Sequence, residues 1–182
     1  GTWALSGSDD RIINRWSLPE NCITQSWEGH MGAVNVIILN ADESYAYSGS
    51  QDRSIRRWDT TTHPNMPRSK SCIQTYNGHT AEVRALAITQ DGNWLFSGSK
   101  DNTVRRWEVS TGHCLSIWYE HREVITSIVL AVNDSLVITG SYDKKLTRWE
   151  TTASQCWVIG QGHTANVTAL LLSPDSNTAL ST

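Results

Sequence analysis

The sequence predicts an all-β chain built from repeated units of four short antiparallel strands, and three observations carry that prediction. First, nine Trp residues stand against a single Phe in 182 residues, a bias that arises when one motif is copied several times. Second, four segments align without gaps, beginning at Ser6, Ser48, Ser97 and Thr139 and each ending in Trp. Third, no stretch combines the length and the 3.6-residue periodicity of a helix.

A single repeat period shows the order of the expected elements. The predicted strands are short runs bounded by turn sequences, at 83–88, 94–99, 104–107 and 114–118. The segments 90–93, Gln-Asp-Gly-Asn, and 100–102, Lys-Asp-Asn, are typical of tight turns. Four strands in a period of about 42 residues correspond to one blade of a β-propeller.

The repeated positions keep a fixed spacing. Each aligned segment has an Asp six residues before its Trp, and a His precedes each of the last three segments, with a fourth at His163. The separation from His to the next Asp is 22 residues for His30, His79 and His121. Successive repeat Trp residues are 42, 49 and 42 residues apart. The longest period holds a seven-residue insertion at 62–68, a candidate secondary contact.

These spacings, the Ser-Gly-Ser-x-Asp segment and the Asp-Thr, Glu-Val or Glu-Thr pair after Trp resemble the WD-repeat propeller family over essentially the whole chain. The chain departs from the family pattern in two ways: only Asp59 keeps the Asp after Trp, and an Arg precedes every repeat Trp. The resemblance implies one propeller domain over 1–182. Its expected parts are a partial blade at 1–28, blades at 29–76, 77–118 and 119–160, and a partial blade at 161–182.

A Ser, a His and an Asp at fixed spacing would suggest a catalytic triad, but the set recurs once per blade, whereas an active site is normally single. The family resemblance implies instead that His, Asp, Ser or Thr, and Trp form a structural hydrogen-bond network in each blade. The expected members are His30, Ser48, Asp52, Trp58, His79, Ser97, Asp101, Trp107, His121, Thr139, Asp143, Trp149, His163, Asp10 and Trp16. No catalytic residue is predicted, and motif resemblance alone confers no chemistry.

The four cysteines occupy equivalent repeat positions, at Cys22, Cys72, Cys114 and Cys156. Zinc ligands favour short Cys-x-x-Cys spacing, which the chain lacks. We therefore predict reduced thiols, no metal, no cofactor and an intracellular protein, either cytoplasmic or nuclear.

The Arg before each repeat Trp has two structural interpretations. Arg15, Arg57, Arg106 and Arg148 either stack on aromatic rings and pair with acids between blades, or extend their charged groups to water. A phosphate-binding stripe is a weaker alternative.

The two ends of the chain overlap in the repeat. Residues 2–8 and 177–182 both correspond to the second strand of a blade. Three arrangements follow: a closed four-blade monomer, a two-chain eight-blade ring, or a fragment of a larger ring. In the two closed arrangements, segment 167–172 joins the N-terminal strands and His163 completes the network of Asp10 and Trp16.

Composition limits the partners. Hydrophobic residues make up 38% and charged residues 18% of the chain, with a net charge of −3, which is typical of a globular protein. The charge argues against a nucleic-acid partner. No apolar run approaches the roughly 20 residues of a membrane helix.

The predicted function is therefore a non-catalytic scaffold that binds proteins or peptides through loops at the propeller rim. The candidate partner-binding residues differ between blades, unlike the network residues. They are Asp9, Gln51, Lys100, Tyr142, Met31, Glu82, Arg122, Val124 and Asn166. The alternative is a phospho-ligand or nucleic acid bound through Arg and Lys, which added salt would release.

Overall fold

The computed structural model describes residues 2–61, 72–131, 133–151 and 156–182. All regular structure in these residues is β-strand, and every pairing is antiparallel. The predicted fold class is confirmed. The insertion at 62–68 lies outside the described residues.

Three sheets are complete, each with four strands in chain order. The first contains β4 (Val34–Leu39), β5 (Tyr45–Ser50), β6 (Ile55–Asp59) and β7 (Cys72–Tyr76). The second contains β8 (Val83–Ile88), β9 (Trp94–Ser99), β10 (Val104–Glu108) and β11 (Cys114–Trp118). The third contains β12 (Ile125–Leu130), β13 (Leu136–Ser141), β14 (Lys145–Glu150) and β15 (Cys156–Gln161).

Two smaller sheets lie at the ends of the described chain. The N-terminal sheet contains β1 (Trp3–Gly7), β2 (Ile13–Ser17) and β3 (Cys22–Trp27). The C-terminal sheet contains β16 (Leu170–Leu172) and β17 (Ala179–Ser181). By repeat position, β1 and β17 are both second strands, and β16 is a first strand.

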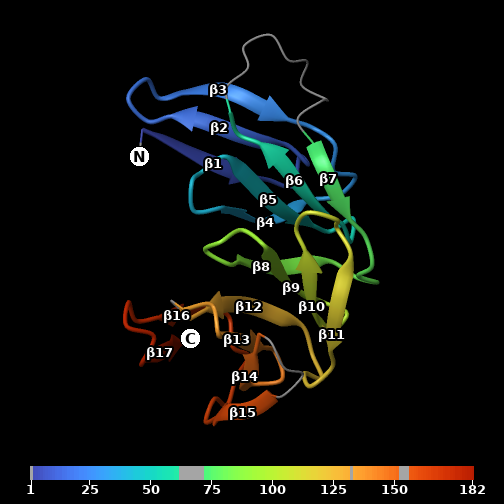
Figure 1. The fold of residues 1–182 in the computed structure, drawn as a ribbon, viewed down its shortest axis with the longest axis vertical. Helices are drawn as coiled ribbons and strands as arrows, with labels where there is room; N and C mark the ends of the chain where they lie inside the picture. Colours follow the sequence, from blue (N-terminus) through green and yellow to red (C-terminus); the bar gives the residue numbers. More distant parts are fainter. Residues whose placement is uncertain (1, 62–71, 132, 152–155) are drawn as a thin grey trace.

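The sheets follow one another along an open arc (Figure 1). The first strands β4, β8 and β12 contact one another in sequence along its inner side, and the last strands β7, β11 and β15 lie toward its outer side (Figure 1). The closed four-blade monomer, one of the expected arrangements, is therefore not formed. Each end supplies its own second strand, since β1 pairs with β2 and β17 pairs with β16. Neither end needs the other for that pairing.

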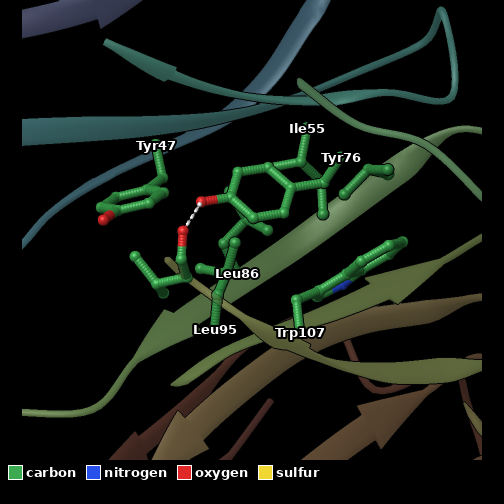
Figure 2. Close-up of a cluster of buried hydrophobic side chains, with 8 residues drawn as sticks. Tyr47, Ile55, Tyr76, Leu86, Leu95 and Trp107 are labelled. Carbon is green, nitrogen blue, oxygen red and sulfur yellow. Dashed lines mark hydrogen bonds between the residues drawn. The ribbon is translucent and has the colours of Figure 1, made fainter. Parts of the chain in front are cut away.

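The hydrophobic core lies between consecutive sheets. One cluster joins Tyr47, Ile55 and Tyr76 of the first complete sheet to Leu86, Leu95 and Trp107 of the second, as Figure 2 shows. The Tyr76 hydroxyl donates to the Val109 carbonyl across the same boundary, at 3.2 Å. A second cluster joins Phe96, Val104 and Trp118 to Ile125, Val137 and Trp149. Hydrophobic packing therefore holds each complete sheet against the next.

A glycine at each of these boundaries allows the close approach. A Cβ atom at Gly49 would lie 2.6 Å from Val83 Cγ1, and one at Gly7 would lie 2.5 Å from Val34 Cγ1. Gly98 faces Ile125 in the same way. The Gly of the repeated Ser-Gly-Ser segment is therefore needed because the first strand of the next sheet packs directly on its backbone.

Candidate functional site

Each complete sheet is fastened by one chain of side-chain hydrogen bonds. In the first, His30 Nδ1 lies 2.8 Å from Asp52 Oδ2, and His30 Nε2 lies 2.7 Å from Ser48 Oγ. Trp58 Nε1 donates to the same Ser48 Oγ at 2.7 Å. Because Ser48 accepts from the indole, its own hydrogen is free for His30 Nε2. The arrangement fits a neutral imidazole that donates from Nδ1 to the carboxylate.

The other two complete sheets repeat this geometry with distances of 2.7–2.9 Å. Their members are His79, Asp101, Ser97 and Trp107 in one sheet, and His121, Asp143, Thr139 and Trp149 in the other. All three histidines and all three hydroxyl residues are buried. Such a network specifies the position of the loop that carries the His relative to the turn that carries the Asp.

The carboxylates of the network have further donors. Asp52 Oδ2 also accepts the Met31 N–H at 2.8 Å, and Oδ1 accepts the Ser54 N–H and hydroxyl at 2.9 and 2.6 Å. Burial raises the pKa of Asp52, but hydrogen bonds from His30, from Ser54 and from backbone N–H groups outweigh it and hold the pKa well below its ordinary value. The pKa of Asp101 is lowered by the same balance, in which the His79 bond is the largest favourable contribution.

We expect the free energy of unfolding to decrease in two stages as the pH falls. Burial lowers the pKa of His79, more than the bond to Asp101 raises it. The unfolded chain therefore takes up more protons below about pH 6.5, and stability falls there first. The carboxylates of Asp52 and Asp101 have lowered pKa values, so their contribution is present above about pH 3.9 and is lost below it.

Urea unfolding followed by tryptophan fluorescence from pH 8 to pH 3 measures both stages. A free energy of unfolding that stays constant from pH 8 to pH 5 would contradict the role given to His79.

The two end sheets each hold part of a network. Trp16 Nε1 donates to Ser6 Oγ at 2.8 Å, and Asp10 Oδ1 accepts the Ile12 N–H at 2.9 Å. At the other end, His163 Nε2 lies 2.6 Å from Ser181 Oγ. The structure does not bring His163 together with Asp10 and Trp16, which corrects the expectation for a closed ring. Ser181 and Ser6 hold the same repeat position. The hydroxyl of Ser181 therefore bonds His163 at the C-terminal sheet, and that of Ser6 bonds Trp16 at the N-terminal sheet.

The Arg before each repeat Trp stacks on an aromatic ring. The guanidinium carbon of Arg57 lies 3.7 Å from the Tyr45 ring centroid, and that of Arg106 lies 4.1 Å from the Trp94 ring centroid. Arg106 Nη1 also donates to the Thr151 carbonyl of the next sheet at 2.7 Å. Arg15 likewise stacks on Trp3 and donates to the Thr60 carbonyl, and Arg148 lies over Trp157. The expected stacking is present, and Arg15 and Arg106 reach the next sheet through carbonyl oxygens rather than acids.

The Glu that replaces Gly before His121 has a packing explanation that sequence reasoning missed. A Cβ atom at Gly78 would lie 2.6 Å from Arg105 Nη1 and 3.2 Å from Trp107 Cη2, so a side chain there would require that Arg to move. The third complete sheet has Thr147 at the position of Arg105, and Glu120 occupies the position of Gly78. Burial and then the Glu120 charge raise the pKa of Cys156, which places Glu120 beside the last strand of that sheet. The two replacements occur together in this one sheet, and the pair was readable from the aligned repeats.

The candidate rim residues lie on the loops that these networks hold. Six are exposed: Asp9, Met31, Gln51, Lys100, Arg122 and Asn166. Three are half-buried: Glu82, Val124 and Tyr142. Glu82 forms ion pairs with Arg84 at 2.7 Å and with Lys100 at 3.2 Å. The Asn102 side chain donates to the Arg122 carbonyl at 3.0 Å and so links two neighbouring sheets at the rim.

The residue that follows each network His has its backbone held by a hydrogen bond, while its side chain is exposed. The N–H groups of Met31, Thr80 and Arg122 donate to the network carboxylates at 2.8, 2.9 and 3.1 Å. The three side chains are exposed, Met31 to 76%. The network therefore presents three different side chains at equivalent and rigid positions.

No group of His, Cys, Asp or Glu that could hold a metal ion occurs among the described residues. The described part of the chain also contains no helix long and apolar enough to cross a membrane.

Comparison with protein-family models matches the WD domain, G-beta repeat, at residues 21–59, 70–108 and 112–150, more than half of the chain. Comparison with curated proteins found no match. Each matched segment ends with the third strand of one sheet and takes in the last strand of the sheet before it. The sequence repeat and the sheet are thus offset by one strand.

Proposed function

Because the chain belongs to the WD40 repeat family, we propose that it is a non-catalytic scaffold that binds a protein or peptide through the rim at the His and Asp side of its sheets. WD40 repeats generally mediate protein–protein interaction. The observation that carries the proposal is the backbone held beside each network His. A side chain on a fixed backbone loses less entropy on binding, and such preorganisation increases affinity.

The side chains at these positions suit an asymmetric protein partner. Met31 and Arg122 are exposed and are residue types enriched at interfaces. Because the equivalent positions differ from sheet to sheet, a partner can be recognised in one orientation. The candidate rim residues also carry both signs of charge, with the acids Asp9 and Glu82 and the bases Lys100 and Arg122. This mixture supports a protein partner over a phospho-ligand or nucleic acid, for which one sign of charge would prevail.

Introducing an acid at Met31 is expected to weaken partner binding at least about tenfold, which corresponds to about 1.4 kcal/mol. The matched control is Leu18→Asp. Leu18 is 52% exposed and lies in the turn between β2 and β3, at the edge opposite the rim. Partners captured by cross-linking from a cell extract are quantified first, and the affinity of the enriched partner is then measured for each variant.

Equal affinity of the Met31→Asp variant and the unmodified chain, or a larger loss for Leu18→Asp, would overturn the rim proposal. Strong release of the partner from the unmodified chain between 50 and 200 mM salt would instead favour the phospho-ligand or nucleic-acid alternative.

An intracellular location, cytoplasmic or nuclear, is part of the proposal. Its support is that the four cysteines are free thiols, as is usual in reducing compartments. Subcellular fractionation tests it, and recovery from the secreted fraction would contradict it.

A further inference from the structure

One Asn-Gly pair occurs in the 182-residue sequence, at Asn77-Gly78. It lies between two residues that the structure holds firmly. Tyr76 ends β7, is buried, and donates its hydroxyl hydrogen to a carbonyl of the next sheet at 3.2 Å. His79 is bonded through both ring nitrogens, at 2.8 and 2.7 Å. The Asn-Gly pair between these anchors is exposed to water.

The reactive groups of this pair are free of hydrogen bonds within the described part of the chain. No described residue accepts the Gly78 N–H, and none bonds the side-chain amide of Asn77. A Cβ atom at position 78 would lie 2.6 Å from Arg105 Nη1, so the packing of this loop favours glycine. Without a side chain, the Gly78 nitrogen can be approached closely by a neighbouring group.

We propose that Asn77-Gly78 is a site of spontaneous deamidation, and that its isoaspartate product disrupts the His79 network. The Gly78 nitrogen loses its proton to hydroxide and attacks the side-chain carbonyl carbon of Asn77. A nitrogen–carbon bond forms, the bond from that carbon to the amide nitrogen breaks, and ammonia leaves. Water then opens the resulting succinimide ring at one of its two carbonyls, which gives either aspartate or isoaspartate. The reaction needs no oxidant or reductant.

The equivalent positions of the other sheets lack this chemistry. The residues there are Glu28, Tyr119 and Gln161. A glutamate carboxylate is a poor target for a nitrogen nucleophile, and a tyrosine side chain has no carbonyl. Gln161 is also followed by glycine, but a glutamine must close a larger ring, which is slower. The modification is therefore specific to the loop that enters the second complete sheet.

Asp91-Gly92, the one Asp-Gly pair of the sequence, can form the same succinimide but is restrained by the structure. The Gly92 N–H donates to the Thr89 carbonyl at 3.0 Å, which occupies the attacking nitrogen. The Asp91 carboxylate accepts from the Thr89 hydroxyl at 2.6 Å and from the Asn93 N–H and side-chain amide at 3.0 and 2.6 Å. Folding thus protects the reacting atoms of Asp91-Gly92 and leaves those of Asn77-Gly78 free.

Isoaspartate at position 77 changes the backbone between two anchored residues. The chain then runs through the former side chain and gains a CH₂ group between Tyr76 and His79. The next residue, Thr80, is also fixed, because its N–H donates to the Asp101 carboxylate at 2.9 Å. The added length therefore displaces His79 from its partners and weakens the network. Ordinary aspartate adds charge alone, and the equivalent Glu28 already places an acid before a network loop.

Reaction rates at the two sites test the first part of the proposal. The chain is incubated folded and in concentrated urea at the same pH and temperature. Trypsin then separates the sites by cutting after Arg84, and chromatography resolves the isoaspartate peptides. The rate in urea divided by the rate in the folded chain gives the protection at each site. We expect protection at Asp91 to exceed that at Asn77 at least about tenfold, or about 1.4 kcal/mol in activation free energy. Equal protection at both sites would overturn the proposal.

Two variants test the effect on the network. Asn77→Gln keeps a neutral amide that reacts slowly, and freshly purified Asn77→Asp carries the charge without the added backbone atom. After incubation, we expect the isoaspartate form of the unmodified chain to unfold at a lower urea concentration than the fresh chain. Incubated Asn77→Gln and fresh Asn77→Asp should keep the midpoint of the fresh chain. An isoaspartate form with an unchanged midpoint, or an equal loss in fresh Asn77→Asp, would contradict disruption through the backbone.

Discussion

Trp107→Ala is expected to lower the free energy of unfolding by about 3–5 kcal/mol. The ring is fully buried, and it contacts Tyr76 and His79 edge to face with ring centroids 6.0 Å apart. Its loss leaves a cavity between two sheets. It also removes the indole N–H that Ser97 accepts at 2.8 Å, and an unsatisfied buried group adds to the cost. Urea unfolding followed by circular dichroism measures the change.

Trp16→Ala is the matched control for this substitution, because Trp16 holds the same repeat position in an incomplete sheet. Its ring is 36% exposed, and we expect a loss of about 1 kcal/mol. If the two alanine variants lose equal stability, the burial between sheets is not the source of the Trp107 contribution.

Gly98→Ala is expected to destabilise the chain by about 1–3 kcal/mol through overpacking. The added Cβ would overlap the Ile125 side chain, which is itself fully buried at the start of β12. The steric strain arises between β9 and the first strand of the next sheet. Gly98 lies within β9, so no turn beside it can shift to relieve the strain. The unfolding midpoint in urea reports the change.

The control for Gly98→Ala is Gly162→Ala. A Cβ at Gly162 meets nothing within 4 Å, so the same added methyl group should change stability by no more than about 0.5 kcal/mol. A Gly98→Ala variant as stable as the control would show that the next sheet can shift to make room.

Strands within a sheet were predictable because each follows from local signals. The segments 94–99 and 114–118 coincide with β9 and β11, and 104–107 is one residue shorter than β10. Turn residues bound each run on both sides, so periodicity and turn chemistry agree. The members of the network in the three complete sheets were also predictable, since their spacing repeats with the sheet. The network expected to join His163 to Asp10 and Trp16 is not formed.

Contacts between sheets were only partly predictable. Arg106 stacks on Trp94 of the same sheet. The carbonyl that accepts its hydrogen bond belongs to Thr151, 45 residues away in the sequence. A backbone carbonyl leaves no residue type in the sequence to signal it. The sequence also left undecided whether the ring closes. Repeat spacing identifies β1 and β17 as equivalent second strands, but it does not indicate which of them pairs with β16.

The position of the core between sheets determines how the molecule resists disruption. The clusters of buried side chains each contain residues of two neighbouring sheets. The cooperative folding unit is therefore a pair of neighbouring sheets. The second complete sheet belongs to two such pairs with complete partners, whereas the sheets at the two ends each belong to one. Among the described sheets, nearest-neighbour coupling is therefore strongest around the second complete sheet, and this sheet is expected to open last.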